Sequence, residues 1–207
     1  SRRLSSSDQP IIFTSERPTP SAGDWGGISI SDSADAATAL CGVTIAYAAT
    51  GLKLEKAAGH FRNLILDHCT VGGRIVSCTD LAVDASRVLY TQDGVKATGN
   101  TRLSMTNNTF SHGVTGIDAS GNEASTYAGN NFFDLSGVGL SCADTAGSIS
   151  VTNNLFVAKT GLGLRISGQP PTVDYNTFDA AYGIQVVNGV PTIRKNILVA
   201  GTSFTGQ

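Results

Sequence analysis

Hydrophobic and polar residues alternate in short segments along this chain, and the segments recur at a regular interval. One recurring segment is a glycine followed by an apolar, a polar and another apolar residue, as at residues 116–119 (GIDA) and 163–166 (GLRI). Alternation with a period of two predicts a β-strand that buries one face. Helical repeats would instead show a period of 3.6 over ten or more residues, which no segment does. The pattern therefore predicts an all-β chain.

A second recurring phrase contains asparagine followed by apolar residues, as at residues 107–110 (NNTF) and 153–156 (NNLF). The second residue of the phrase is an asparagine five times, at steps of 23, 23, 22 and 20 residues. Those positions are Asn108, Asn131, Asn154, Asn176 and Asn196. A fixed period in this range is typical of stacked structural repeats. Three short strands fit in each repeat, so successive repeats should pair as parallel strands in a solenoid.

The opening segments 10–15 (PIIFTS) and 23–28 (GDWGGI), together with the repeated phrases, resemble the right-handed parallel β-helix superfamily of bacterial secreted and cell-surface proteins, which includes pectate lyases. The resemblance implies a right-handed, single-stranded parallel β-helix of about nine coils of about 22 residues. It covers nearly the whole chain and predicts a single domain over residues 1–207. Residues 1–24 are expected to form an N-terminal cover, and the chain to be part of a longer protein.

In that superfamily, one asparagine per coil points inward and bonds to its neighbours as a ladder. The resemblance gives this structural role to Asn108, Asn131, Asn154, Asn176 and Asn196. Stacked amides satisfy one another where water is excluded. The phenylalanines two residues later should stack inside, at Phe110, Phe133, Phe156 and Phe178. The asparagine pattern fails toward the N-terminus, at Tyr47, at His68 and at Ser86 or Arg87.

The four cysteines match no metal-binding spacing. Cys142 falls at an inward position and is expected to be a small core residue. A disulfide between Cys41 and Cys78 is an alternative, although two coils of about 4.8 Å exceed the usual Cα separation of a disulfide. The oxidation states of Cys41, Cys69 and Cys78 stay open at this point.

Charged residues make up only 14% of the chain, and the formal net charge is −2. A nearly neutral chain generates no field that would attract nucleic acid, so no nucleic-acid partner is expected. No apolar run approaches the ~18–20 residues that span a bilayer, so no membrane insertion is expected. The open strand edges at the ends of a solenoid allow end-to-end or trimeric self-association.

The central residue of each glycine phrase must point outward, because its neighbours point inward. These residues form an outward column with an ambiguous position at Arg74 or Ile75. Its members Lys53, Lys96, Asp118, Arg165 and Gln185 are the candidate substrate-binding residues. Sugar hydroxyl groups suit Asp and Gln, and the carboxylates of an acidic glycan suit Lys and Arg. A solvated sheet face without function is the alternative interpretation.

Carboxylates and a cation are dense between residues 80 and 93, and the candidate catalytic residues are Asp80, Asp84, Arg87 and Asp93. The motifs of the superfamily's lyases and hydrolases (Gly-His-Gly, Arg-Ile-Lys and Arg-x-Pro-x-x-Arg) do not occur. No metal site or cofactor is expected for a binding protein, whereas a lyase of this superfamily would use Ca²⁺. The Asp67–His68 pair suggests proton transfer, but neighbouring strand residues diverge unless a turn bends them together.

Two functions therefore follow from the sequence. The first is a bacterial secreted or cell-surface β-helix scaffold that binds a carbohydrate polymer. The second is a polysaccharide lyase or glycoside hydrolase with a diverged active site near residues 80–93, so the enzymatic status stays open.

Overall fold

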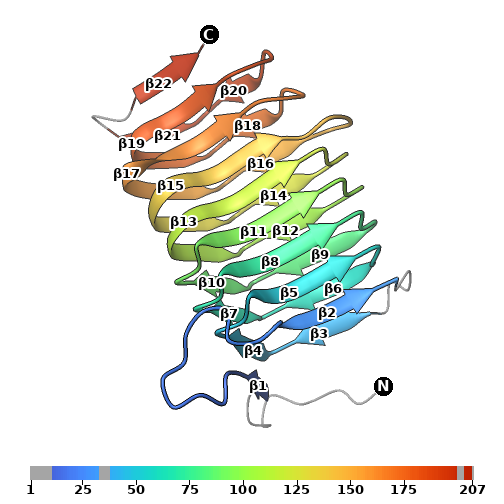
Figure 1. Ribbon diagram of the computed structural model, residues 1–207. Coiled ribbons are helices and arrows are strands. Elements are labelled where there is room, and N and C mark those ends of the chain that lie inside the picture. The colour runs from blue at the N-terminus through green and yellow to red at the C-terminus, as the bar shows by residue number, and fades with distance from the viewer. Residues whose placement is uncertain (1–10, 33–37, 200–202, 207) are drawn as a thin grey trace.

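The computed structural model describes residues 11–32, 38–199 and 203–206, and every regular element in these ranges is a β-strand. The strands stack in chain order along one axis, from the N-terminal to the C-terminal coil (Figure 1). All strand pairs are parallel, as at β4–β7 and β16–β18. The prediction of an all-β parallel solenoid is confirmed.

Three strands form each coil. The first strands make one sheet of eight among the described residues: β3 (Ala39–Cys41), β6 (Gly59–Arg62), β9 (Leu81–Asp84), β12 (Ser104–Thr106), β14 (Thr126–Ala128), β16 (Ser150–Thr152), β18 (Thr172–Asp174) and β20 (Thr192–Arg194). This sheet defines about eight coils of about 22 residues.

The second and third strands join in a 14-stranded sheet. In the N-terminal half they are separate: β1 (Ile11–Phe13), β4 (Val43–Ala46), β7 (Ile65–Asp67) and β10 (Arg87–Leu89), then β2 (Ile28–Ser31), β5 (Thr50–Glu55), β8 (Val71–Val76) and β11 (Asp93–Thr98). Later coils fuse them in β13 (Thr109–Ser120), β15 (Asn131–Ala143), β17 (Leu155–Ile166) and β19 (Thr177–Val186), and β21 (Ile197–Leu198) and β22 (Ser203–Gly206) follow. Among the described strands, β2 and β22 add partial coils at the two ends, so the third-strand face has nine positions, whereas the first-strand sheet gives about eight coils rather than the expected nine.

A line of hydrogen-bonded amides runs inside the corner between the first and second strands. Its members are Asn108, Asn130, Asn154, Asn176 and Asn196. Each Oδ1 accepts the backbone N–H of the equivalent residue in the preceding coil at 2.8–2.9 Å, and Nδ2–Oδ1 distances between neighbours are 2.9–3.1 Å. Ser86 extends the line, donating its N–H to Asn108 and accepting the N–H of Leu64. We call this line the first inner column.

The prediction for Asn131 is wrong by one residue. Asn130 is fully buried and occupies the first inner column, whereas Asn131 begins β15 and pairs with Thr109 and Leu155 on the outer side. The same shift applies to the aromatic stack, which contains Phe132 rather than Phe133. The step from Asn130 to Asn154 is 24 residues, because the coil that contains β15 is longer than its neighbours.

The phenylalanine stack fills the core beside the first inner column. Its members are Phe110, Phe132, Phe156 and Phe178, with ring centroids 5.2, 4.7 and 4.7 Å apart and nearly parallel planes. All four rings are at most 1% exposed. A parallel helix forces equivalent residues to lie one above the other, so ring spacing follows strand spacing.

A second inner column lies in the corner between the third and first strands, and the sequence analysis missed it. Its members are Cys78, Asn100, Asn122 and Asp144, and Nδ2 of Asn122 donates to Oδ1 of Asp144 at 2.7 Å. Oδ2 of Asp144 accepts the hydroxyl of Tyr127 at 2.8 Å. In the next coil the equivalent position is Gly168, which has no side chain to accept a further bond. An acceptor-only carboxyl group therefore ends the column.

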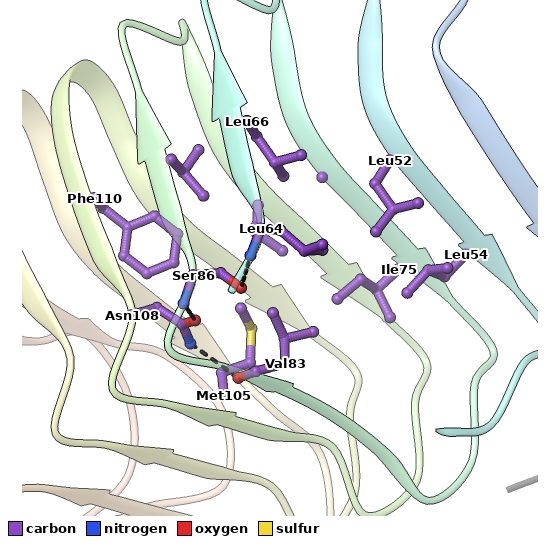
Figure 2. A pocket seen from close by; sticks show the side chains of 13 residues that line it. Leu52, Leu54, Leu64, Leu66, Ile75, Val83, Ser86, Met105, Asn108 and Phe110 are labelled. Atoms are coloured by element: carbon purple, nitrogen blue, oxygen red, sulfur yellow. Dashed lines mark hydrogen bonds between the residues drawn. The ribbon is translucent and has the colours of Figure 1, made fainter. Parts of the chain in front are cut away.

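The ambiguous position in the glycine phrase is resolved by strand pairing. Gly73 lies inward between Leu52 and Val95, and Arg74 lies outward between Lys53 and Lys96. Because Gly73 lacks a side chain, a small apolar cavity of about 20 Å³ remains beside Leu52, Ile75 and Phe110 (Figure 2). The cavity is too small for a ligand and represents incomplete packing.

Filling this cavity should stabilise the fold. We expect Gly73→Ala to raise the free energy of unfolding by about 1 kcal/mol, because a buried methyl group is added and the unfolded chain is restricted. The new Cβ would lie 3.1 Å from Val95 Cγ2, which borders the cavity and has room to shift. Urea denaturation measures the change.

The neighbouring glycine provides the control. A Cβ at Gly72 would lie 2.5 Å from Val88 Cγ1 and 2.6 Å from the backbone oxygen of Gly94, so Gly72→Ala should destabilise by about 2 kcal/mol or more. Equal effects at the two positions would contradict this register.

The assignment of Asn130, rather than Asn131, to the first inner column is also testable. Asn130→Ala removes bonds to Met105 O and Asn154 and leaves donors of Asn108 unpaired, which should cost about 2–4 kcal/mol of unfolding free energy. Asn131→Ala should cost less than about 0.5 kcal/mol, because such surface changes are usually small. Chemical denaturation of the two variants measures this difference, and the reverse order would restore the original assignment.

Candidate functional site

The outward column on the third strands is continuous and in register. Pairing places its members on successive strands: Ser29, Lys53, Arg74, Lys96, Asp118, Ser141, Arg165, Gln185 and Thr205. All five candidate substrate-binding residues belong to this line. Ile75, the alternative to Arg74, is buried in the core. Neighbouring strands lie about 4.8 Å apart, so the column presents one polar group at each such step along the axis.

Two cations of the column are engaged by acidic neighbours. Nζ of Lys53 lies 2.7 Å from Oε2 of Glu55, and Nζ of Lys96 lies 2.9 Å from Oδ2 of Asp93. The hydrogen bond from Lys53 is the main cause that lowers the pKa of Glu55. Arg165 is exposed and makes no ion pair within the described ranges. Arg74 is likewise exposed and without an ion pair among the described residues, so each half of the column has an uncompensated cation, and the one in the C-terminal half is Arg165.

A hollow of about 400 Å³ lies beside that unpaired cation. Arg165 and Gln185 line it together with Thr205, and backbone and apolar atoms of residues 186, 187 and 206 complete the wall. Tyr182, which is 56% exposed, lies three residues before Gln185 on the same strand. A guanidinium, an amide and a hydroxyl group can together hydrogen-bond a ligand that carries hydroxyl and carboxylate groups.

The candidate catalytic residues have separate partners. Asp80 is bonded to Arg102, with Nη2–Oδ2 at 2.6 Å, and this contact lowers the pKa of Asp80. Asp84 accepts bonds from Thr106 and Asn107, and Asp93 is paired with Lys96. Arg87 is exposed on β10 and pairs through its backbone. In the described part of the chain, no hydrogen bond or ion pair joins these four side chains to one another.

Asp67 and His68 are brought together by a turn. His68 has a φ of 49°, in the left-handed region, and its Nδ1 lies 2.8 Å from Oδ1 of Asp67. The turn therefore brings the side chains of Asp67 and His68 together, although neighbouring residues within a strand would diverge. His68 is also part of a line of stacked rings on the surface, with Tyr47, Tyr90 and His112. The placement of Tyr47 and His68 at the asparagine position is wrong, because both lie at the corner between the second and third strands, whereas Ser86 extends the asparagine column. The recurrence of an aromatic ring in four coils was the signal that could have identified this line.

All four cysteines are free in the structure. Cys41 is exposed, whereas Cys69, Cys78 and Cys142 are buried, so the alternative of a Cys41–Cys78 disulfide is not realised. Burial, with a smaller contribution from Asp144, raises the pKa of Cys142 to about 12. Cys142 is therefore a protonated core residue, as expected. Within the described ranges, no group of three or more His, Cys, Asp or Glu side chains is arranged to hold a metal ion.

Comparison with known proteins identifies the family. No curated protein matches the chain significantly. No helix in the described ranges has the length and hydropathy required to cross a membrane. The family model for the right-handed β-helix region matches residues 23–202, which is most of the chain and agrees with the parallel coils of the structure. The chain therefore belongs to the right-handed β-helix family.

Proposed function

We propose that this protein is a secreted or cell-surface β-helix of bacterial origin that binds a carbohydrate polymer along its outward column. The observation that supports this most strongly is the in-register polar line that ends in the hollow beside Arg165, Gln185 and Thr205. A polymer whose units repeat at a short interval can contact several rungs of such a line, and each rung then adds a small amount of binding free energy.

Arg74 and Arg165 are the cations of the column without an ion pair among the described residues, and Arg165 lies beside the hollow, which favours an acidic carbohydrate at the C-terminal end. Lys53 and Lys96 each share their charge with a neighbouring carboxylate, which weakens their attraction for an anion. Arg165 retains its full charge, and a guanidinium can hold a carboxylate through two parallel hydrogen bonds. Gln185 and Thr205 supply donors and acceptors for the hydroxyl groups of the same sugar.

Binding without catalysis is the better-supported function of the two. A lyase or hydrolase needs carboxylates and a cation that converge on one bond of the substrate. Here Asp80, Asp84 and Asp93 are each engaged by a different partner along the chain. The outward column, by contrast, is already aligned without any rearrangement.

The proposal predicts a specific loss of binding. We expect the wild-type protein to be retarded by polygalacturonate in affinity gel electrophoresis, and Arg165→Ala to raise the dissociation constant about tenfold or more, because a charge-assisted hydrogen bond is worth about 1.5–3 kcal/mol. Gln185→Ala should raise it about threefold to tenfold.

Arg62→Ala is the matched control, since Arg62 is an exposed arginine on the first-strand face. It should leave retardation unchanged. Retardation that is lost equally in Arg62→Ala and Arg165→Ala would show a non-specific charge effect, and no retardation by any acidic or neutral glycan would refute carbohydrate binding. Release of unsaturated or reducing ends from the polymer would show an enzyme instead.

A further inference from the structure

A line of aromatic side chains crosses the surface of four consecutive coils, at the corner between the second and third strands. The members are Tyr47, His68, Tyr90 and His112, and we call the line the Tyr–His ridge. Successive ring centroids are 5.3, 4.7 and 4.6 Å apart, with planes tilted by 22–30°. Tyr90 is 50% exposed, and the side chains of His68 and His112 are 44% and 47% exposed. The ridge is therefore accessible to solvent over most of its length.

The backbone of the ridge is unfavourable for the residues that occupy it. All four have φ between 49° and 59°, in the left-handed region. This region costs an L-residue roughly 1–2 kcal/mol, and Gly and Asn tolerate it best. The same conformation recurs at the other corners in residues of several kinds, such as Asn107, Ala85 and Tyr175, and at the ridge's own corner in Asp134 of the next coil. Ring-on-ring contact offsets part of the cost, at about 0.5–1.5 kcal/mol per aromatic pair. The left-handed conformation is therefore a property of the corners, and the observation that points to a function of the rings is their recurrence, at the surface, in four consecutive coils.

The ridge presents ring edges, because each ring covers the face of the next. A sugar cannot lie flat on a face inside the stack. At the edges, the tyrosine hydroxyl groups donate and accept hydrogen bonds. Oδ1 of Asp67 lies 2.8 Å from Nδ1 of His68, which favours the tautomer with the proton on Nδ1. Nε2 of His68 has no partner among the described residues, and it can hydrogen-bond a sugar hydroxyl group as donor or as acceptor. The result is a straight row of polar atoms with apolar ring edges between them.

The spacing of the rings and the charges beside them indicate which class of ligand the ridge can bind. An extended peptide places side chains on one face every ~6.6 Å, which does not match a spacing of 4.6–5.3 Å. Asp67 and Asp134 lie beside His68 and His112 and would repel the phosphates of a nucleic acid. A polysaccharide of uncharged pyranose units carries hydroxyl groups at a repeat similar to the coil spacing, and its C–H groups can pack on ring edges.

We propose that the Tyr–His ridge is a second binding site, at which a neutral polysaccharide lies along the helix axis with about one sugar unit per coil. The proposal rests on the carbohydrate specificity proposed above but concerns a different surface and a different charge class. The acidic polymer binds at the hollow beside Arg165, and the neutral polymer binds at the corner formed by the N-terminal coils.

The test uses variants that remove a ring without disturbing the turn. Tyr90→Asn deletes the central tyrosine, and Asn tolerates the left-handed conformation, so the variant should fold. Tyr175→Asn is the matched control, because Tyr175 is 52% exposed with a φ of 59° at another corner. Binding of linear β-1,4-linked glucose oligomers of two to six units is followed by isothermal titration calorimetry and by the imidazole NMR signals of His68 and His112.

We expect affinity to rise with oligomer length up to about four units, since the ridge contains four rings. Tyr90→Asn should weaken binding of the four-unit oligomer at least fivefold, and Tyr175→Asn should leave it unchanged. The imidazole signals should shift on titration in the wild-type protein. No binding, an equal loss in both variants, or binding without a shift of either imidazole would overturn the ridge proposal.

The two carbohydrate proposals fail in different ways. Loss of the glucose-oligomer response with intact retardation by polygalacturonate refutes the ridge alone. Arg165→Ala should not alter binding of the neutral oligomer, and Tyr90→Asn should not alter retardation by polygalacturonate. If each variant weakened both ligands equally, the polymers would share one site and the ridge would not be a second one.

Discussion

Backbone amides at the corners of each coil have to be satisfied inside the protein, and the two inner columns do this. At a corner the chain leaves the sheet, so its N–H group has no strand partner and an unpaired buried group costs about 1–3 kcal/mol. In the first inner column each Asn Oδ1 accepts the corner N–H of the preceding coil, and its Nδ2 donates to a core carbonyl group, as Asn154 does to Tyr127 O. Cys78 and Asn100 show the same arrangement in the second column. The chain can therefore turn at each of these corners without leaving a buried backbone N–H group unpaired.

The same constraint organises the outer surface. Corners that repeat in every coil keep equivalent residues one above the other, so each outer position becomes a line along the axis. A single side chain such as Arg165 then acts beside its neighbours Ser141 and Gln185. Function on this fold depends on which residues occupy a line, because the spacing between them is fixed by strand pairing.

Structural features that follow from the repeat period could be predicted from the sequence. Residues whose register is ambiguous by one position could not be assigned correctly. The outward column follows from alternation alone, and strand pairing confirms its order. At residues 130–133 (NNFF), both asparagine and phenylalanine are doubled, so either register satisfies the pattern, and only the buried position of Asn130 decides between them. The second inner column has members as different as Cys78 and Asp144, which share no phrase. The residues that line the hollow beside Gln185 come together only in the folded protein, and the alternation of apolar and polar residues does not predict them.

Stacked aromatic rings lie on the surface in the N-terminal coils and in the core in the later coils, and this change bears on the role of the ridge. In the coils of Tyr47, His68 and Tyr90, the inward residues next to the same corner are aliphatic: Ile45, Leu66 and Val88. The inner phenylalanine stack begins at Phe110, two residues before the ridge ends at His112. The ridge therefore supplies ring-on-ring contact where the core has none, and a purely structural role would explain the stack itself. It would not explain why the rings lie at the surface, with Tyr90 half exposed, since an interior stack achieves the same contact while burying apolar area.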